Sequence, residues 1–175
     1  SFFRDEIAGP LGSEFWIGTP EEVEPRVAPM MMHAPKPGDP IGEFMMKIMT
    51  DPRSTQALSL LNTGGFDPNS RACHAAEIGG GGGISNARGL AGMYAPLACG
   101  GELGGVRLVD RAQLARMGEV SVATNEDATL LIPTRFSLGF MKSMDNRRRP
   151  RGDRDSAILS SAAFGHVGAG GSIGF

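Results

Sequence analysis

The hydrophobic pattern changes its period along this chain, and that change constrains the possible folds more than any other feature. Before about residue 130 the apolar residues recur at helical spacing between turn-forming residues. From Phe136 to Met141 they alternate with small or polar residues, as in a half-buried strand. We therefore predict an α+β fold, with a helical and loop region at 1–134 and antiparallel strands at 135–175.

Two further short strands are predicted at 162–166 and 172–175, on either side of the glycine turn GAGG. A sheet of three strands is marginal by itself, so other elements must cover it. The chain stops directly after the last strand and opens with a helix that has no cap. We therefore expect one incomplete domain whose two ends continue in a longer sequence.

The segment DNRRRPRGDRD at 145–155 separates the first predicted strand from the next. Its five arginines and its proline and glycine predict a solvated loop. An anion site and the adhesion tripeptide RGD are alternative interpretations, although a three-residue match is common by chance.

Three helices are predicted in the first third of the chain from caps and stops. A helix at 3–8 ends at Gly9, which precedes a proline. Thr19 is predicted to cap a short helix that Pro25 stops, and Asp39 to cap a longer one that ends before residue 51.

The most organised stretch begins after a run of five glycines at 79–83. Ser85 is predicted to cap an apolar helix that Pro96 should kink or loosen. Paired glycines at 100–101 and 104–105 then predict a helix end and a tight turn, and Asp110 is predicted to cap the next helix.

Six methionines are concentrated in one part of the chain: Met30, Met31, Met32, Met45, Met46 and Met49. Thioether side chains adapt to irregular shapes and could line a binding surface. Core packing or a domain seam is the simpler interpretation, because apolar helix stripes usually face a core, and we favour it.

Composition excludes several classes of function. A formal net charge of -2 provides no basic field for nucleic acid, and no apolar run approaches the length of a membrane span. The two cysteines do not make a disulfide framework, and His33, His74 and His166 lack metal-ligand spacing, so no metal or cofactor is predicted. The oligomeric state stays open, as does the compartment, for which the cytoplasm is slightly favoured.

Two glycine-rich motifs suggest chemistry that their context does not support. The run at 79–83 resembles a phosphate-binding loop but lacks the G-K-[ST] ending, so we interpret it as a helix entry. The segment GGSIG, with Ser172 at its centre, matches a nucleophile elbow, which requires a following helix, an acid and a histidine. No such residues follow it in this sequence.

Three segments in order carry a resemblance to a known family: FRDEIAGPLGSEFWIGTPEE, GGGGGISNARGLAGMYAPLACGGELGGVRLVD and FGHVGAGGSIGF. Together they resemble the carboxyl-terminal half of the serine beta-lactamase-like hydrolases, especially the family VIII carboxylesterases, which are related to class C beta-lactamases and penicillin-binding proteins. The resemblance covers nearly the whole chain. It implies part of a beta-lactamase/transpeptidase-like fold.

The resemblance also implies site residues. The family's S-x-x-K and Y-x-N motifs have no match here, and Tyr94, the sole tyrosine, lies in a predicted helix. His166, Val167 and Gly168 match the third motif, K-T-G or its H-x-G variant, as substrate-binding residues. The backbone N–H of Ala169 is implied as one donor of the oxyanion hole.

The implied reaction of the intact enzyme is hydrolysis of a small ester or beta-lactam-like substrate through an acyl-serine intermediate. Because an imidazole, unlike an ammonium, is mostly uncharged near neutral pH, we favour neutral esters over beta-lactams. The 175 residues alone are expected to be inactive. The alternative is a degenerate, non-catalytic module of the same fold that binds a ligand or serves in assembly.

Overall fold

A computed structural model describes residues 1–31, 36–168 and 171–175. The chain divides into two compact units, which are described separately below. The first unit holds the described residues of Ser1–Met32 and Phe66–Leu114, with Gly174. The second holds those of His33–Gly65 and Ala115–Ile173, with Phe175.

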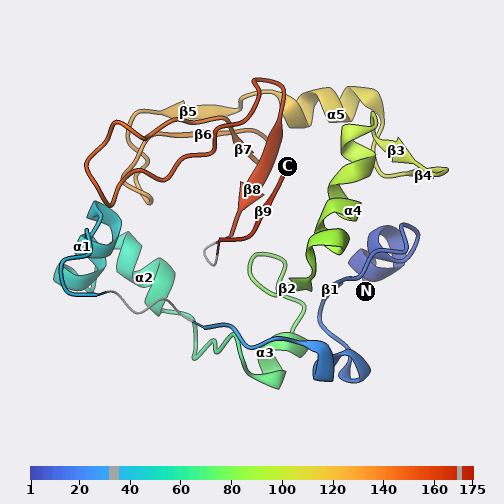
Figure 1. The fold of residues 1–175 in the computed structure, drawn as a ribbon, viewed down its shortest axis with the longest axis horizontal. Helices are drawn as coiled ribbons and strands as arrows, with labels where there is room; N and C mark the ends of the chain where they lie inside the picture. The colour runs from blue at the N-terminus through green and yellow to red at the C-terminus, as the bar shows by residue number, and fades with distance from the viewer. Residues whose placement is uncertain (32–35, 169–170) are drawn as a thin grey trace. The chain divides into compact units, whose positions relative to one another are not determined.

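The first unit combines short helices with two antiparallel strand pairs (Figure 1). Strand β1 pairs with β2 in a register that sets Trp16 opposite Ile84, and β3 pairs with β4. The elements are η1 (Phe3–Ala8), β1 (Phe15–Ile17), η2 (Glu21–Arg26), α3 (Arg71–Ala75), β2 (Gly83–Ser85), α4 (Ala87–Ala98), β3 (Glu102–Leu103) and β4 (Val106–Arg107).

The opening helix is confirmed over Phe3–Ala8, and it is a wide π-helix. The N–H of Gly9 donates to the carbonyl of Arg4, five residues earlier, at 2.9 Å. A Cβ on Gly9 would collide with that carbonyl, so a glycine is required where the helix ends.

Two predicted caps in this unit are wrong. Helix η2 begins after Pro20, and the buried Thr19 hydroxyl has no hydrogen-bond partner among the residues that the structure describes. Helix α4 is capped by Asn86, whose side chain accepts from the N–H of Gly89, whereas Ser85 lies in strand β2. Both residues were selected as caps by the local pattern. In the structure Ser85 is part of strand β2, and Thr19 is a buried residue.

The helix end and the tight turn predicted after α4 are confirmed, because α4 ends at Ala98 and Gly104 and Gly105 form the β3–β4 turn with positive φ. The helix continues through Pro96 without the loosening that was predicted there. Asp110 caps α5 (Arg111–Gly118), because its carboxylate accepts from the N–H of Gln113 at 2.6 Å. Cys73 and Cys99 are free thiols, at half-buried and exposed positions respectively.

The second unit contains two helices and most of a five-stranded sheet in the order β5-β6-β7-β8-β9. Strands β5 to β8 pair antiparallel with their neighbours. Ile132, Met141 and Met144 form its buried apolar cluster, with Leu130 and Phe136 packed against it. The elements are α1 (Glu43–Thr50), α2 (Thr55–Leu61), β5 (Val122–Thr124), β6 (Thr134–Phe136), β7 (Met141–Lys142), β8 (Phe164–Val167) and β9 (Ile173–Gly174).

The single strand predicted from Phe136 to Met141 is instead a hairpin. Strand β6 ends at Phe136, which lies opposite Met141 at the start of β7. Between them the N–H of Ser137 donates to the carbonyl of Phe140 at 2.8 Å, and Gly139 has φ of 80°. The alternation of apolar and small residues therefore spans a turn, which the glycine makes possible.

Helix α1 begins later than predicted, and its cap comes from a distant part of the sequence. The backbone N–H of Glu43 donates to Oδ1 of Asp153 at 2.7 Å, whereas the carboxylate of Asp39 accepts from the N–H of Lys36. Asp153 is 7% exposed, so the end of the arginine-rich segment is not the fully solvated loop that was predicted.

Core packing is the wrong interpretation for the described methionines. Met30, Met31, Met45, Met46 and Met49 are 45–90% exposed, and Met32 lies outside the described residues. No helix in the described part of the chain is long and apolar enough to cross a bilayer.

Candidate functional site

Strand β8 carries the residues that the sequence analysis assigns to the substrate strand. Its pairing with β7 joins Met141 to Gly165 and Lys142 to Phe164. His166 and Val167 lie past the last of these residue pairs, and both are exposed, as is Gly168. The structure therefore presents the H-x-G residues together, at the accessible end of one strand.

The turn after β8 is closed by backbone hydrogen bonds. The N–H of Gly168 donates to the carbonyl of Ser172 at 2.7 Å, and the N–H of Gly171 donates to the carbonyl of Gly168 at 3.0 Å. A Cβ on Gly168 would meet the hydroxyl of Ser172, which would have to rotate away, whereas the backbone of Ser172 lies at ordinary contact distance. Ala169, the expected oxyanion donor, lies outside the described residues.

The ring of His166 is oriented by its own strand. Its Nδ1 lies 2.7 Å from the carbonyl oxygen of Val167. Because a carbonyl can only accept, Nδ1 is the donor in this contact. The ring centroid lies 6.3 Å from that of Phe136 on β6.

A buried lysine lies on the neighbouring strand, and the sequence analysis did not single it out. Lys142 is 3% exposed; its Nζ donates to the carbonyl of Ala162 at 3.2 Å and lies 5.9 Å from the ring centre of Phe164. Burial, with a smaller contribution from Arg135, lowers the pKa of this ammonium. Because neighbouring strand residues point to opposite faces of a sheet, no local signal in the sequence marked Lys142 as buried next to Met141.

Two further residues from the sequence analysis, Ser172 and Tyr94, pack against glycines in the described structure. Ser172 is exposed, and its hydroxyl lies beside Gly168 in the described structure. Tyr94 lies on α4, as predicted, and its ring packs against Gly174.

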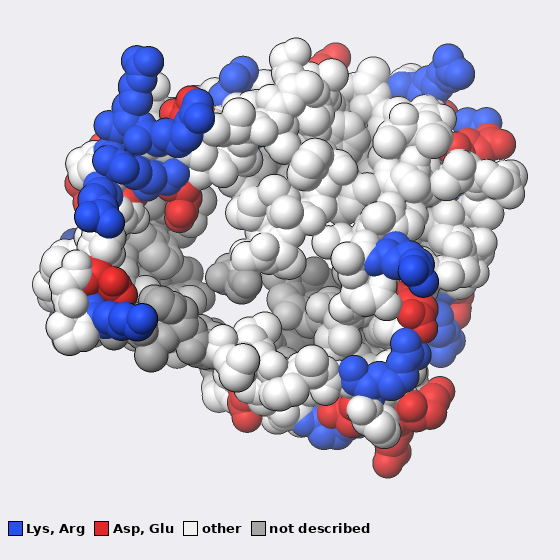
Figure 2. Space-filling view, in the orientation of Figure 1, with Lys and Arg blue, Asp and Glu red and all other residues white. Residues whose placement is uncertain are grey.

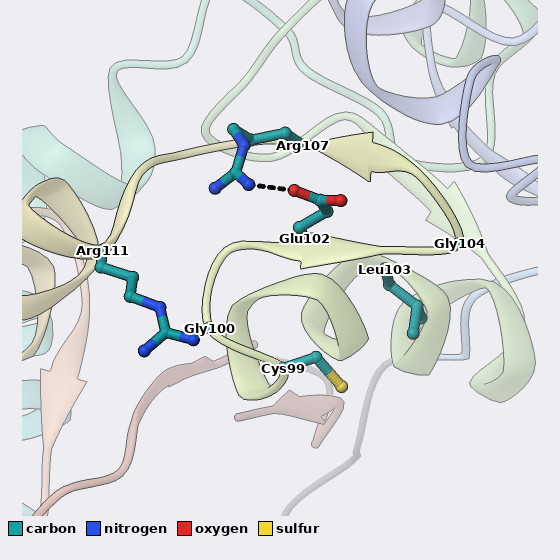
Figure 3. A pocket seen from close by; sticks show the side chains of 7 residues that line it. All are labelled: Cys99, Gly100, Glu102, Leu103, Gly104, Arg107 and Arg111. Atoms are coloured by element: carbon teal, nitrogen blue, oxygen red, sulfur yellow. Dashed lines mark ion pairs between the residues drawn. The ribbon is translucent and has the colours of Figure 1, made fainter.

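A separate pocket of about 330 Å³ lies in the first unit, around the β3–β4 hairpin and the end of α4 (Figure 3). Glu102 and Arg107 form an ion pair across the hairpin, and Arg111 extends from another side of the pocket. None of the residues assigned to the substrate strand lines it. In the described ranges no three His, Cys, Asp or Glu side chains gather in a way that could hold a metal ion.

Comparison with known proteins decides the family. The model of the Beta-lactamase family matches residues 1–175. The chain belongs to the beta-lactamase family. This agrees with the three segments from which the resemblance was inferred.

Proteins that are similar to this chain include two esterases, by name, and a penicillin-binding protein homolog. The Esterase/beta-lactamase LipL of Mycobacterium tuberculosis is 29% identical over 177 residues, which cover 99% of this chain and 38% of the relative. A crystal structure of a family VIII carboxylesterase is 27% identical, with a TM-score of 0.61, over 93% of this chain and 40% of that one. A penicillin-binding protein homolog from Caulobacter crescentus is 25% identical, with a TM-score of 0.66, over 94% and 39%.

These similarities confirm the fold class. The mixed helices and antiparallel sheet match those of beta-lactamase/transpeptidase-like structures. The chain spans about two fifths of the length of these relatives.

Proposed function

We propose that this chain supplies the substrate-binding strand of a serine esterase that works through an acyl-serine intermediate. The observation that supports this proposal is the accessible end of β8, where His166, Val167 and Gly168 lead into a closed glycine turn. Membership of the beta-lactamase family and the esterase relatives agree with this reaction class.

The chemistry assigns a role to each part of the strand. A serine outside these 175 residues attacks the ester carbonyl, and water later releases the acid. The backbone N–H of Ala169 donates to the developing oxyanion, and loss of one such donor can cost about 100-fold or more in kcat. His166 faces the substrate without a permanent charge, which favours neutral esters over anionic beta-lactams.

The test uses the complete reading frame that encodes this chain, with a nitrophenyl ester as substrate. Gly168→Val should lower kcat/KM by about 100-fold or more, because a branched side chain would fill the space beside the strand. Leu138→Ala, a change in the exposed β6–β7 turn, should leave kcat/KM within about twofold. Equal activity in the two variants would contradict the proposal.

The 175 residues expressed alone should show no esterase turnover and no labelling by a fluorophosphonate. Covalent labelling of Ser172 would overturn both the proposed division of roles and our rejection of the nucleophile elbow.

A non-catalytic module of the same fold is the second candidate, because the sequence contains neither S-x-x-K nor Y-x-N. The coding region upstream of Ser1 separates the two. An S-x-x-K followed by a tyrosine motif supports the esterase, and their absence supports the module.

A further inference from the structure

The arginine-rich segment between β7 and β8, here called the arginine loop (residues 145–155), is held in place at two buried points. Asn146 is 3% exposed, and its amide nitrogen donates to the carbonyls of Pro133 and Asp155 at 3.2 and 2.8 Å. Asp153 is the buried cap of α1. The loop is therefore pre-organised beside the first turn of that helix.

The arginine loop contains five arginines and three aspartates, so its formal charge is +2. Arg147 forms two hydrogen bonds to Asp145, which lower the pKa of that carboxyl to about 2. Asp153 faces the backbone of α1. Across the described residues, Arg148 and Arg151 make no ion pair or side-chain hydrogen bond.

The two remaining guanidinium groups of the loop, those of Arg149 and Arg154, donate to backbone carbonyls and keep their charge. Figure 2 shows Lys and Arg side chains gathered over this part of the second unit. Their concentration contrasts with the formal net charge of -2 for the whole chain.

Helix α1, beside the arginine loop, exposes apolar side chains. Ile48 is buried at 8% exposure, whereas Met45, Met46 and Met49 are 45%, 45% and 64% exposed. At 100° per residue these three methionines cover one arc of the helix, with Met49 in its middle. This arc is here called the methionine face.

We propose that the arginine loop and the methionine face together form a surface that binds anionic lipid membranes. Arginine side chains are attracted to lipid phosphates, and exposed flexible apolar side chains enter the boundary between headgroups and acyl chains. Nucleic acid would match the charge but would leave the methionines without a partner. A lipid headgroup and a free phosphate ion both present a phosphate group to the arginines. The test must therefore distinguish binding of lipid from binding of free phosphate.

The experiment measures sedimentation of the full chain with vesicles of phosphatidylcholine, with and without about one-third phosphatidylglycerol. Binding should require the anionic lipid and should weaken as salt is raised. Excess soluble glycerol phosphate should not displace the protein. Displacement by glycerol phosphate would assign the loop to a free phosphate instead, and equal binding to neutral vesicles would overturn the role of the arginines.

Arg148→Ala with Arg151→Ala should lower the partition coefficient by roughly 10–30-fold, because each arginine near an anionic surface contributes a several-fold effect. Arg88→Ala with Arg116→Ala removes the same charge from other exposed sites and should have a much smaller effect. An equal fall in the partition coefficient of the two double variants would show that only net charge matters, and would overturn the proposal.

Met49→Ser tests the methionine face separately. It should weaken vesicle binding and leave the melting temperature nearly unchanged, because the side chain is exposed. A fall in melting temperature with unchanged vesicle binding would show that this face packs against protein, and would contradict the proposal.

Discussion

His74 shows how one residue can couple folding to pH. It is 8% exposed, with Nδ1 at 2.8 Å from Oε1 of Glu24 and Nε2 at 2.8 Å from the carbonyl of Pro68. Both partners accept, so the ring satisfies both only when it carries two protons. The hydrogen bond to Glu24 is the main reason that the pKa of His74 is raised; burial and the charge of Arg71 oppose it.

We predict that the stabilisation from His74 is complete below about pH 6.5, the ordinary imidazole value, and is lost as pH rises through the raised pKa of the folded state. Urea unfolding from about pH 5.5 to pH 8.5 should show this loss. His74→Gln should lower the free energy of unfolding by about 1–3 kcal/mol at low pH and should flatten the profile. An unchanged pH profile in the variant would exclude His74 as the titrating group.

The two interior glycines of α4 meet different surroundings, although both are helical. A Cβ on Gly89 would collide with the carbonyl of Glu14 and the hydroxyl of Ser85. A Cβ on Gly92 would lie no closer than 3.6 Å to its nearest neighbour, the hydroxyl of Ser13.

Alanine should therefore have opposite effects at these two positions. Gly92→Ala should raise the free energy of unfolding by up to about 1 kcal/mol, as helix propensity predicts. Gly89→Ala should lower it by about 1–3 kcal/mol, because backbone atoms of the neighbouring segment must shift. Chemical denaturation provides the measurement. If both changes stabilise the protein, Gly89 does not lie as close to Glu14 and Ser85 as the structure shows.

At the scale of the element, the start of α1 was predicted least well. The sequence offered Asp39 as the cap, but the structure places Asp153 at the first free N–H of the helix. A Cβ on Gly42, the residue before α1, would collide with the carbonyl of Gly152. The close contact between the arginine loop and the start of α1 therefore also requires a glycine at position 42. A pattern within one segment cannot reveal a partner 110 residues away.

Substitution of the two aspartates distinguishes these caps. Asp153→Ala should lower the free energy of unfolding by about 1–2 kcal/mol, whereas Asp39→Ala should change it by less than about 0.5 kcal/mol. Asp153→Asn, which keeps an acceptor oxygen, should recover part of the loss. A larger effect at Asp39 than at Asp153 would restore the cap inferred from the sequence.

The candidate site was located from sequence because its residues are consecutive. The strand and the glycine turn at His166, Val167 and Gly168 were predicted from the local pattern, whereas their role in substrate binding came from the family resemblance and stays a prediction. The nearby Phe136 and Lys142 belong to other strands. Their proximity to β8 depends on sheet order and register, which local alternation does not encode.

At the scale of the whole molecule, the apolar core of the second unit is small. Its buried cluster consists of Ile132, Met141 and Met144, with two partly buried neighbours. Each large apolar side chain in such a cluster therefore accounts for a substantial part of the local burial.

Ile132→Ala should lower the free energy of unfolding by about 2–5 kcal/mol, because it leaves a cavity in this cluster. Ile158→Ala, at a position that is 54% exposed in the same unit, should change it by less than about 0.5 kcal/mol. Denaturant titrations of both variants provide the measurement. Similar effects at the two positions would show that Ile132 is not a core residue.

By itself, the sequence determined the fold class, the family resemblance, the position of the β8 strand and the glycine turns, because caps, turns and hydrophobic periods act over a few residues. Tertiary structure alone decided that Asp153 caps α1, that the alternating run at 136–141 is a hairpin, and that the methionines of α1 face outward. These features depend on which distant segments meet, and a local pattern of residues does not contain that information.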